Sequence, residues 1–64
     1  MELNRVKFNL NREVMYGGTR YLLDSVILRK HKRTNMFYYQ AELKDLKARS
    51  LLVCDLGKIE EIKS

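Results

Sequence analysis

Polar and apolar residues alternate along most of this 64-residue chain, in short runs that break at polar or small residues. Near the start, Val6, Phe8 and Leu10 alternate with Arg5, Lys7 and Asn9. A period of two is typical of a strand with one wet face, because successive side chains of a strand point to opposite faces. The pattern therefore predicts a strand over residues 5–10.

A glycine pair then indicates a hairpin. Gly17-Gly18 follows the β-prone run of residues 13–16, and both central positions of a type I′ turn need positive φ, which glycine adopts without strain. A two-residue turn here predicts two facing pairs on one face of the sheet: Tyr16 with Thr19, and Val14 with Tyr21.

Residues 19–30 are the ambiguous stretch. The preceding glycine pair and the β-branched pair Val26-Ile27 favour a long strand, with Asp24-Ser25 as a bulge or bend between its halves. The same leucines, valine and isoleucine also fit a helical stripe with i, i+4 spacing, so a short helix stays open as the alternative.

The clearest alternation begins at residue 37. Phe37, Tyr39, Ala41 and Leu43 alternate with polar residues and Tyr38, which predicts a strand whose first set points inward. A polar loop is expected before it, over residues 30–35. After it we expect a connection over 45–50, although ELKDLKAR also fits one or two helical turns. The rest of the chain predicts a strand over 50–54, a break at 55–57, and a short strand or turn over 59–62.

About five short strands with tight turns predict one mostly β domain over residues 1–64, with the sheet closed into a small barrel. Closure is favoured because it removes exposed sheet edges, which invite pairing with other chains. The alternative is an α+β arrangement, a small open sheet carrying one short helix.

Short motifs in the second half support this architecture by resemblance. Residues 39–43 (YQAEL) form an aromatic strand ending in an Ala-acidic pair, Asp55-Leu56-Gly57 follows, and residues 59–62 close the chain. In this layout residues 37–62 resemble Tudor and related SH3-like domains, which implies a five-stranded barrel. Leu56 stands where that family has the aromatic of an Asp-Tyr-Gly motif, and the chain has no Trp. The resemblance therefore implies no aromatic cage for methylated lysine or arginine. The chain is also similar in size and look to short bacterial and phage proteins with no function attached.

Composition narrows the class of protein. Apolar residues make up 45% and charged residues 33%, which is typical of a globular domain. Cys54 is the single cysteine, so an intramolecular disulfide is excluded and a reducing compartment is favoured. The amino-terminal segment lacks the apolar core of a signal peptide, and no apolar run is long enough for a transmembrane helix. We expect a soluble, cytoplasmic protein that does not contact membranes.

No constellation for catalysis, a metal or a cofactor emerges. His31 lies in a basic run without a nearby carboxylate to orient it, and Cys54 lies in the apolar run LLVCD, where burial makes a thiol inert. One Cys and one His cannot supply four zinc ligands, and YGGTRY fits neither the dinucleotide nor the phosphate-loop motif. We expect a protein that is not an enzyme and binds no cofactor.

The charge pattern provides the remaining hint. The formal net charge of +5 belongs entirely to residues 1–33, since residues 34–64 carry five charges of each sign. It is concentrated in the sequence RKHKR at residues 29–33. Basic residues beside aromatics are typical of proteins that bind single-stranded nucleic acid, but inward-pointing Phe37 and Tyr39 would leave only Tyr38 for a ligand.

Three interpretations of this loop remain. A solvated hairpin loop is favoured, followed by a contact for nucleic acid and then by a contact for an acidic protein. The candidate contact residues are Arg29, Lys30, Lys32 and Arg33, with Arg20 and Tyr38 as further candidates. The sequence thus predicts a small binding module, and a protein-interaction or homodimeric assembly domain is the alternative, because a 64-residue chain without a disulfide or metal gains core by pairing.

Overall fold

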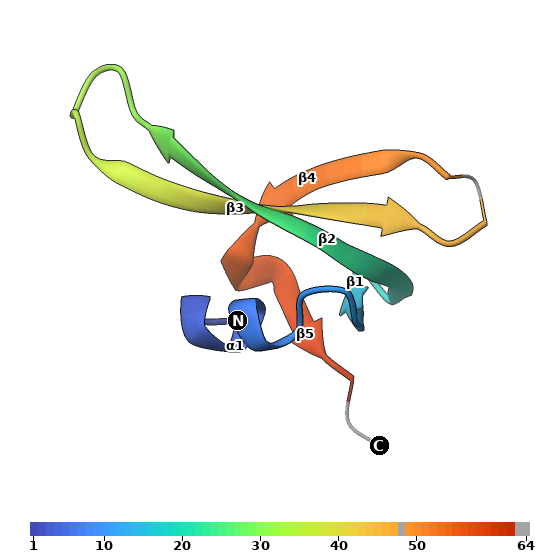
Figure 1. Ribbon diagram of the computed structural model, residues 1–64. Coiled ribbons are helices and arrows are strands. Elements are labelled where there is room, and N and C mark those ends of the chain that lie inside the picture. The colour runs from blue at the N-terminus through green and yellow to red at the C-terminus, as the bar shows by residue number, and fades with distance from the viewer. Residues whose placement is uncertain (48, 63–64) are drawn as a thin grey trace.

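Five antiparallel strands form one sheet in the computed structural model, which describes residues 1–47 and 49–62 (Figure 1). The strand order is β4-β3-β2-β1-β5. The elements are α1 (Leu3–Phe8), β1 (Glu13–Tyr16), β2 (Thr19–Lys30), β3 (Phe37–Asp45), β4 (Leu51–Asp55), the 3-10 turn η1 (Leu56–Lys58) and β5 (Ile59–Glu61).

The prediction of a mostly β domain with about five antiparallel strands is confirmed, but the sheet is not closed into a barrel. Strands β4 and β5 are the two ends of the strand order, and no pairing joins them among the described residues. One short helix, α1, accompanies this open sheet, but it lies at residues 3–8 and not at residues 19–30, where the sequence left a helix open.

The first hairpin has the predicted geometry. Tyr16 pairs with Thr19 and Val14 with Tyr21, and Gly17 and Gly18 have φ angles of 57° and 79°. Both angles lie in the left-handed region, as a type I′ turn requires. Residues 19–30 form a strand, and the pairing of β2 with β3 shifts register between Leu23 and Ser25, so the bulge at Asp24-Ser25 is also confirmed.

The prediction of a strand over residues 5–10 is wrong, because residues 3–8 form helix α1. In the helix, Val6 is fully buried against the core and Phe8 is left outside, 53% exposed. The Phe8 ring lies 4.6 Å from the guanidinium carbons of Arg5 and Arg12, so cations rather than core residues cover it. A strand here would also compete for the edge of β1, which β5 already occupies.

Two further contacts attach α1 to the rest of the molecule. The amino-terminal ammonium of Met1 donates to the carbonyl oxygens of Leu56 at 2.8 Å and Ile59 at 3.3 Å. Arg5 donates through Nε and an Nη to both carboxylate oxygens of Glu61, each at 2.6 Å, and this pair raises the pKa of Arg5. The start of the chain is thus held against its last strand.

The buried side chains all belong to one part of the fold, which we call the body. Its core consists of Val6, Val14, Leu23, Ala41, Leu43, Cys54 and Ile59. These residues come from α1 and from the inner parts of the strands, so the core lies between α1 and one face of the sheet (Figure 1). The body also includes the end of β1, the whole of β5 and the turn η1.

One hairpin extends beyond the body. Strand β1 pairs with β2 only through residues 19–22, and β4 pairs with β3 only from Gln40 onward. Beyond these points β2 and β3 pair only with each other. We call residues 28–39 the arm, and every residue in it is exposed (Figure 1). The radius of gyration, 12.0 Å, exceeds the roughly 11 Å expected of a compact domain of this length, as a projecting arm requires.

Candidate functional site

The arm ends in a tight loop between His31 and Met36. The His31 amide donates to the Met36 carbonyl at 2.8 Å, and the Asn35 amide donates to the His31 carbonyl at 2.9 Å. Asn35 has φ 57°, a left-handed conformation that Asn tolerates better than most residues. The loop is therefore ordered by its own backbone hydrogen bonds and by a residue suited to its left-handed position.

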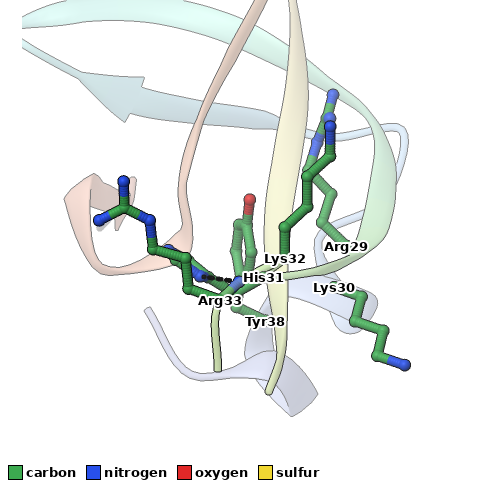
Figure 2. Close-up of a pocket in the computed structure, with 6 residues that line it drawn as sticks. All are labelled: Arg29, Lys30, His31, Lys32, Arg33 and Tyr38. Carbon is green, nitrogen blue, oxygen red and sulfur yellow. Dashed lines mark hydrogen bonds between the residues drawn. The ribbon is translucent and has the colours of Figure 1, made fainter. Parts of the chain in front are cut away.

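Four cations of the sequence-predicted site gather on this loop and the strand ends beside it. Arg29, Lys30, Lys32 and Arg33 line a surface hollow of about 590 Å³ together with His31 and Tyr38 (Figure 2). All four side chains are exposed. The structure thus brings five of the six predicted contact residues together, the four cations and Tyr38.

The segment around these cations supplies no carboxylate. No Asp or Glu occurs between Asp24 and Glu42 in the sequence. Among the described residues, Arg5 and Glu61 form an ion pair, and this pair lies in the body. Crowded like charges without a neighbouring anion in their segment create a positive potential that attracts anionic ligands, most strongly at low salt.

The arm has two faces with different chemistry. Arg29 pairs with Tyr38 across the strands, and Lys30 pairs with Phe37, so these two pairs lie on opposite faces of the hairpin. Figure 2 shows the Arg29 and Tyr38 side chains extending to the same side of the hairpin and the Lys30 side chain extending to the other side. The Lys30 Nζ lies 5.7 Å from the centroid of the Phe37 ring. Each face therefore combines a cation with an aromatic ring.

His31 has a structural contact within the loop. Its Nδ1 accepts a hydrogen bond from the Arg33 amide at 3.3 Å. The His31 ring is tilted by 57° to the Tyr38 ring, with centroids 6.5 Å apart. His31 therefore supports the loop's shape and contributes a ring to the same surface.

The prediction that Phe37 and Tyr39 point into the core is wrong. They share a face with Ala41 and Leu43, but the core ends at Ala41, and Phe37 and Tyr39 remain 65% and 40% exposed. Tyr38, on the other face, is 39% exposed. The strand lengths could have revealed this, because two long predicted strands beside three short ones must extend past the sheet. The arm therefore presents three exposed aromatic rings.

Arg20 lies elsewhere. It pairs with Met15 in the first hairpin and lines a separate hollow with Thr19 and the loop that joins β3 to β4. Arg29 is nine positions farther along β2, which corresponds to roughly 30 Å at about 3.4 Å per residue. The structure therefore does not bring Arg20 to the arm.

Cys54 belongs to the core, with 6% of its surface exposed. Burial raises the pKa of its thiol, and the neighbouring Asp55 carboxylate raises it further, while Lys58 lowers it. A thiol with a raised pKa is a poor nucleophile at neutral pH, because the thiolate is the reactive form. In the part of the chain that the structure describes, no three His, Cys, Asp or Glu residues gather in a way that could hold a metal ion.

No helix within the described residues is both long and apolar enough to cross a bilayer. Comparison with protein-family models, with curated proteins and with solved structures found no match for this chain. The geometry and charge of the arm are therefore the basis on which a function can be assigned.

Proposed function

We propose that this protein is a small, non-enzymatic binding module that contacts nucleic acid through its arm. The observation that carries the proposal is the set of four exposed cations, Arg29, Lys30, Lys32 and Arg33, on a hairpin that projects from the body and contains no acidic residue. A phosphate backbone is the ligand that such a strip of cations fits best, because it offers regularly spaced negative charges.

The arm also has the shape for such a contact. A two-stranded hairpin that pairs with no other strand can follow a backbone or enter a groove without moving the core. The hydrogen bonds of the loop order the backbone that carries Lys32 and Arg33 before a ligand arrives, so little backbone entropy is lost on binding.

The direct test measures affinity for labelled single-stranded and double-stranded oligonucleotides by fluorescence anisotropy. With four phosphates neutralised on a single strand, affinity should fall about 50-fold between about 50 mM and 200 mM salt. Changing Arg29, Lys30, Lys32 and Arg33 together to Gln should remove most of the binding and most of its salt dependence. Absence of binding at low salt would contradict the proposal.

A control of equal net charge separates the arm from the protein's overall charge. Replacing four exposed lysines of the body with Gln changes the net charge by the same amount; these are Lys7, Lys44, Lys47 and Lys58. This variant should keep most of the affinity. If it loses as much as the arm variant, the arm has no special role. Arg20→Gln belongs with the control, because Arg20 lies away from the arm.

A second candidate function, self-association, is favoured by the outer edge of β4. The Asp45 amide bonds the Ser50 carbonyl, and alternation along an antiparallel ladder then directs the backbone groups of Leu51 and Val53 away from β3. Their side chains are 58% and 41% exposed, and residues 51–54 carry no charge. An uncharged edge strand is a template for pairing with a second copy of the chain.

Sedimentation velocity over a concentration series tests this candidate. Val53→Lys places a charge in the middle of the β4 edge and should leave the protein monomeric. Leu46→Lys is the control, because Leu46 is 51% exposed in the adjoining loop but lies outside the strand. A monomer at every concentration in the unmodified protein would exclude pairing through β4.

A further inference from the structure

We infer that one face of the arm is a stacking platform for the bases of a single-stranded nucleic acid. This inference rests on the proposed function and specifies its ligand. The platform consists of Phe37 and Tyr39, together with Leu28 and Lys30, which lie directly opposite them on β2. All four side chains are exposed, Phe37 to 65%, Leu28 to 54% and Tyr39 to 40%.

The two rings have the arrangement that base stacking needs. Phe37 and Tyr39 are two residues apart on one strand, so they lie on the same face and roughly 7 Å apart along it. Neighbouring nucleotides of an extended single strand can therefore each meet one ring. A base stacked on an aromatic side chain contributes to affinity whatever its sequence, because every base has a flat π-face.

A cation stands beside the rings on the same face. Lys30 pairs with Phe37 across the strands, and its Nζ lies 5.7 Å from the ring centroid. Lys30 is also one of the residues that line the hollow near the tip of the arm. A strand whose bases stack on Phe37 and Tyr39 thus has a positive charge within reach of its phosphates. Charge for the backbone and rings for the bases is the combination used by single-strand binders.

The charge of the arm disfavours other occupants of this face. A second copy of the arm would bring two sets of four cations together, and these would repel each other. A duplex satisfies the cations but hides the faces of its bases in the stack. An acidic peptide also satisfies the cations but presents no regular series of flat rings. A single strand uses both the charge and the rings.

The test compares a labelled polypyrimidine single strand, as DNA and as RNA, with a duplex of the same length. The single strand should bind more tightly than the duplex. Phe37→Ala with Tyr39→Ala should weaken single-strand binding by at least about five-fold for each ring while leaving the slope of affinity against salt unchanged. Tyr39→Phe should retain the affinity, because it keeps the ring. Leu10→Ala with Leu46→Ala removes two exposed apolar side chains that lie outside the arm and outside β4, and it should have no effect.

A second readout does not depend on affinity. Bases stacked on Phe37 and Tyr39 should shift their ring protons upfield in the NMR spectrum, while the rings of Tyr16 and Tyr21, which pack edge to face in the body with centroids 6.1 Å apart, should not shift. These body rings serve as the internal reference.

The outcomes separate this inference from the proposed function. If single strand and duplex bind equally and the two alanine changes have no effect, the platform is refuted while the basic arm remains a phosphate contact. If no nucleic acid binds at low salt, both are refuted. If polyglutamate competes as well as the single strand does, the arm recognises acidic chains and the platform is again refuted.

Discussion

Two hairpin loops of this protein share backbone hydrogen bonds and differ in their surroundings. In the loop His31–Met36 and in the loop Asp45–Ser50, the amide of the first residue donates to the carbonyl of the last, at 2.8 and 2.9 Å. In both, the fifth residue donates to the carbonyl of the first and has φ 57°; these residues are Asn35 and Arg49. The turn geometry is thus a local property that two unrelated sequences reach.

The two loops also share one hydrogen bond between a side chain and the backbone. The first residue of each loop accepts a hydrogen bond from the amide two positions on: His31 Nδ1 from Arg33 at 3.3 Å, and Asp45 Oδ1 from Lys47 at 2.8 Å. The acceptor in one loop is an imidazole nitrogen and in the other a carboxylate oxygen. The Asp45 loop therefore supplies an anion beside its own cations, and the His31 loop supplies none.

The strands that lead to the two loops differ more. Strand β3 belongs to both hairpins. Near one end of the strand, Leu43 is fully buried in the core of the body, whereas at the other end the Phe37 side chain is 65% exposed. Alternation places both residues on the same face. One face of a strand can therefore be buried at one end and exposed to solvent at the other, when the elements that pack on that face do not extend along the whole strand.

Truncating β3 at its two ends should give the largest contrast. Leu43→Ala removes a fully buried side chain and should lower the free energy of unfolding by about 3 kcal/mol, whereas Phe37→Ala should change it by less than about 0.5 kcal/mol. Urea denaturation followed by circular dichroism measures both. Leu43→Val, with an expected loss of about 1 kcal/mol, keeps the comparison available if Leu43→Ala does not fold. Equal losses at the two ends would show that the arm packs against something in solution.

Replacing the left-handed residue of each loop should distinguish the turns. Arg49→Gly relieves an ordinary residue held at positive φ and should raise the free energy of unfolding by about 1 kcal/mol. Asn35→Gly should gain only a few tenths of a kcal/mol, because Asn already tolerates this conformation. Thermal unfolding of the two variants checks the ranking. A larger gain at Asn35 than at Arg49 would contradict the shared geometry.

The prediction with the smallest effect near neutral pH concerns Cys54, a buried residue on the edge strand β4. The pKa of its thiol is raised in the folded protein above the ordinary thiol value of 9.0. As the pH rises past 9.0, the unfolded chain therefore loses the thiol proton before the folded protein does. The thiol's contribution to stability is therefore complete below about pH 9 and is lost as the pH rises further, with a slope of at most about 1.4 kcal/mol per pH unit. Urea midpoints measured from pH 7 upward should fall less steeply for Cys54→Ala than for the unmodified protein. Parallel curves would show that the thiol titrates alike in both states.

Local sequence patterns are enough to predict much of the fold. The glycine pair sets the register of the first hairpin. Because Gly17 and Gly18 both adopt positive φ, they form a two-residue turn, and such a turn pairs the residues on either side of it, Tyr16 and Thr19. The alternation over residues 37–44 and the bulge at Asp24-Ser25 also follow from near neighbours in the sequence. The helix over residues 3–8 does not follow, because Val6 and Phe8 fit a strand equally well until the position of the core is known.

The sequence by itself indicated the strands over residues 13–16, 19–30, 37–44 and 50–54, the glycine turn and a run of cations without acidic neighbours, because these depend on residues a few positions apart. It also predicted a strand over residues 5–10, where the structure has α1, and left residues 59–62 open between strand and turn. Only the tertiary structure decided that the sheet stays open and that α1 covers the core. It also decided that the core ends at Ala41, so that Phe37 and Tyr39 join the cations on an exposed arm. The physical reason is that burial depends on which distant elements reach a face, and β1 and β4 stop before the arm begins.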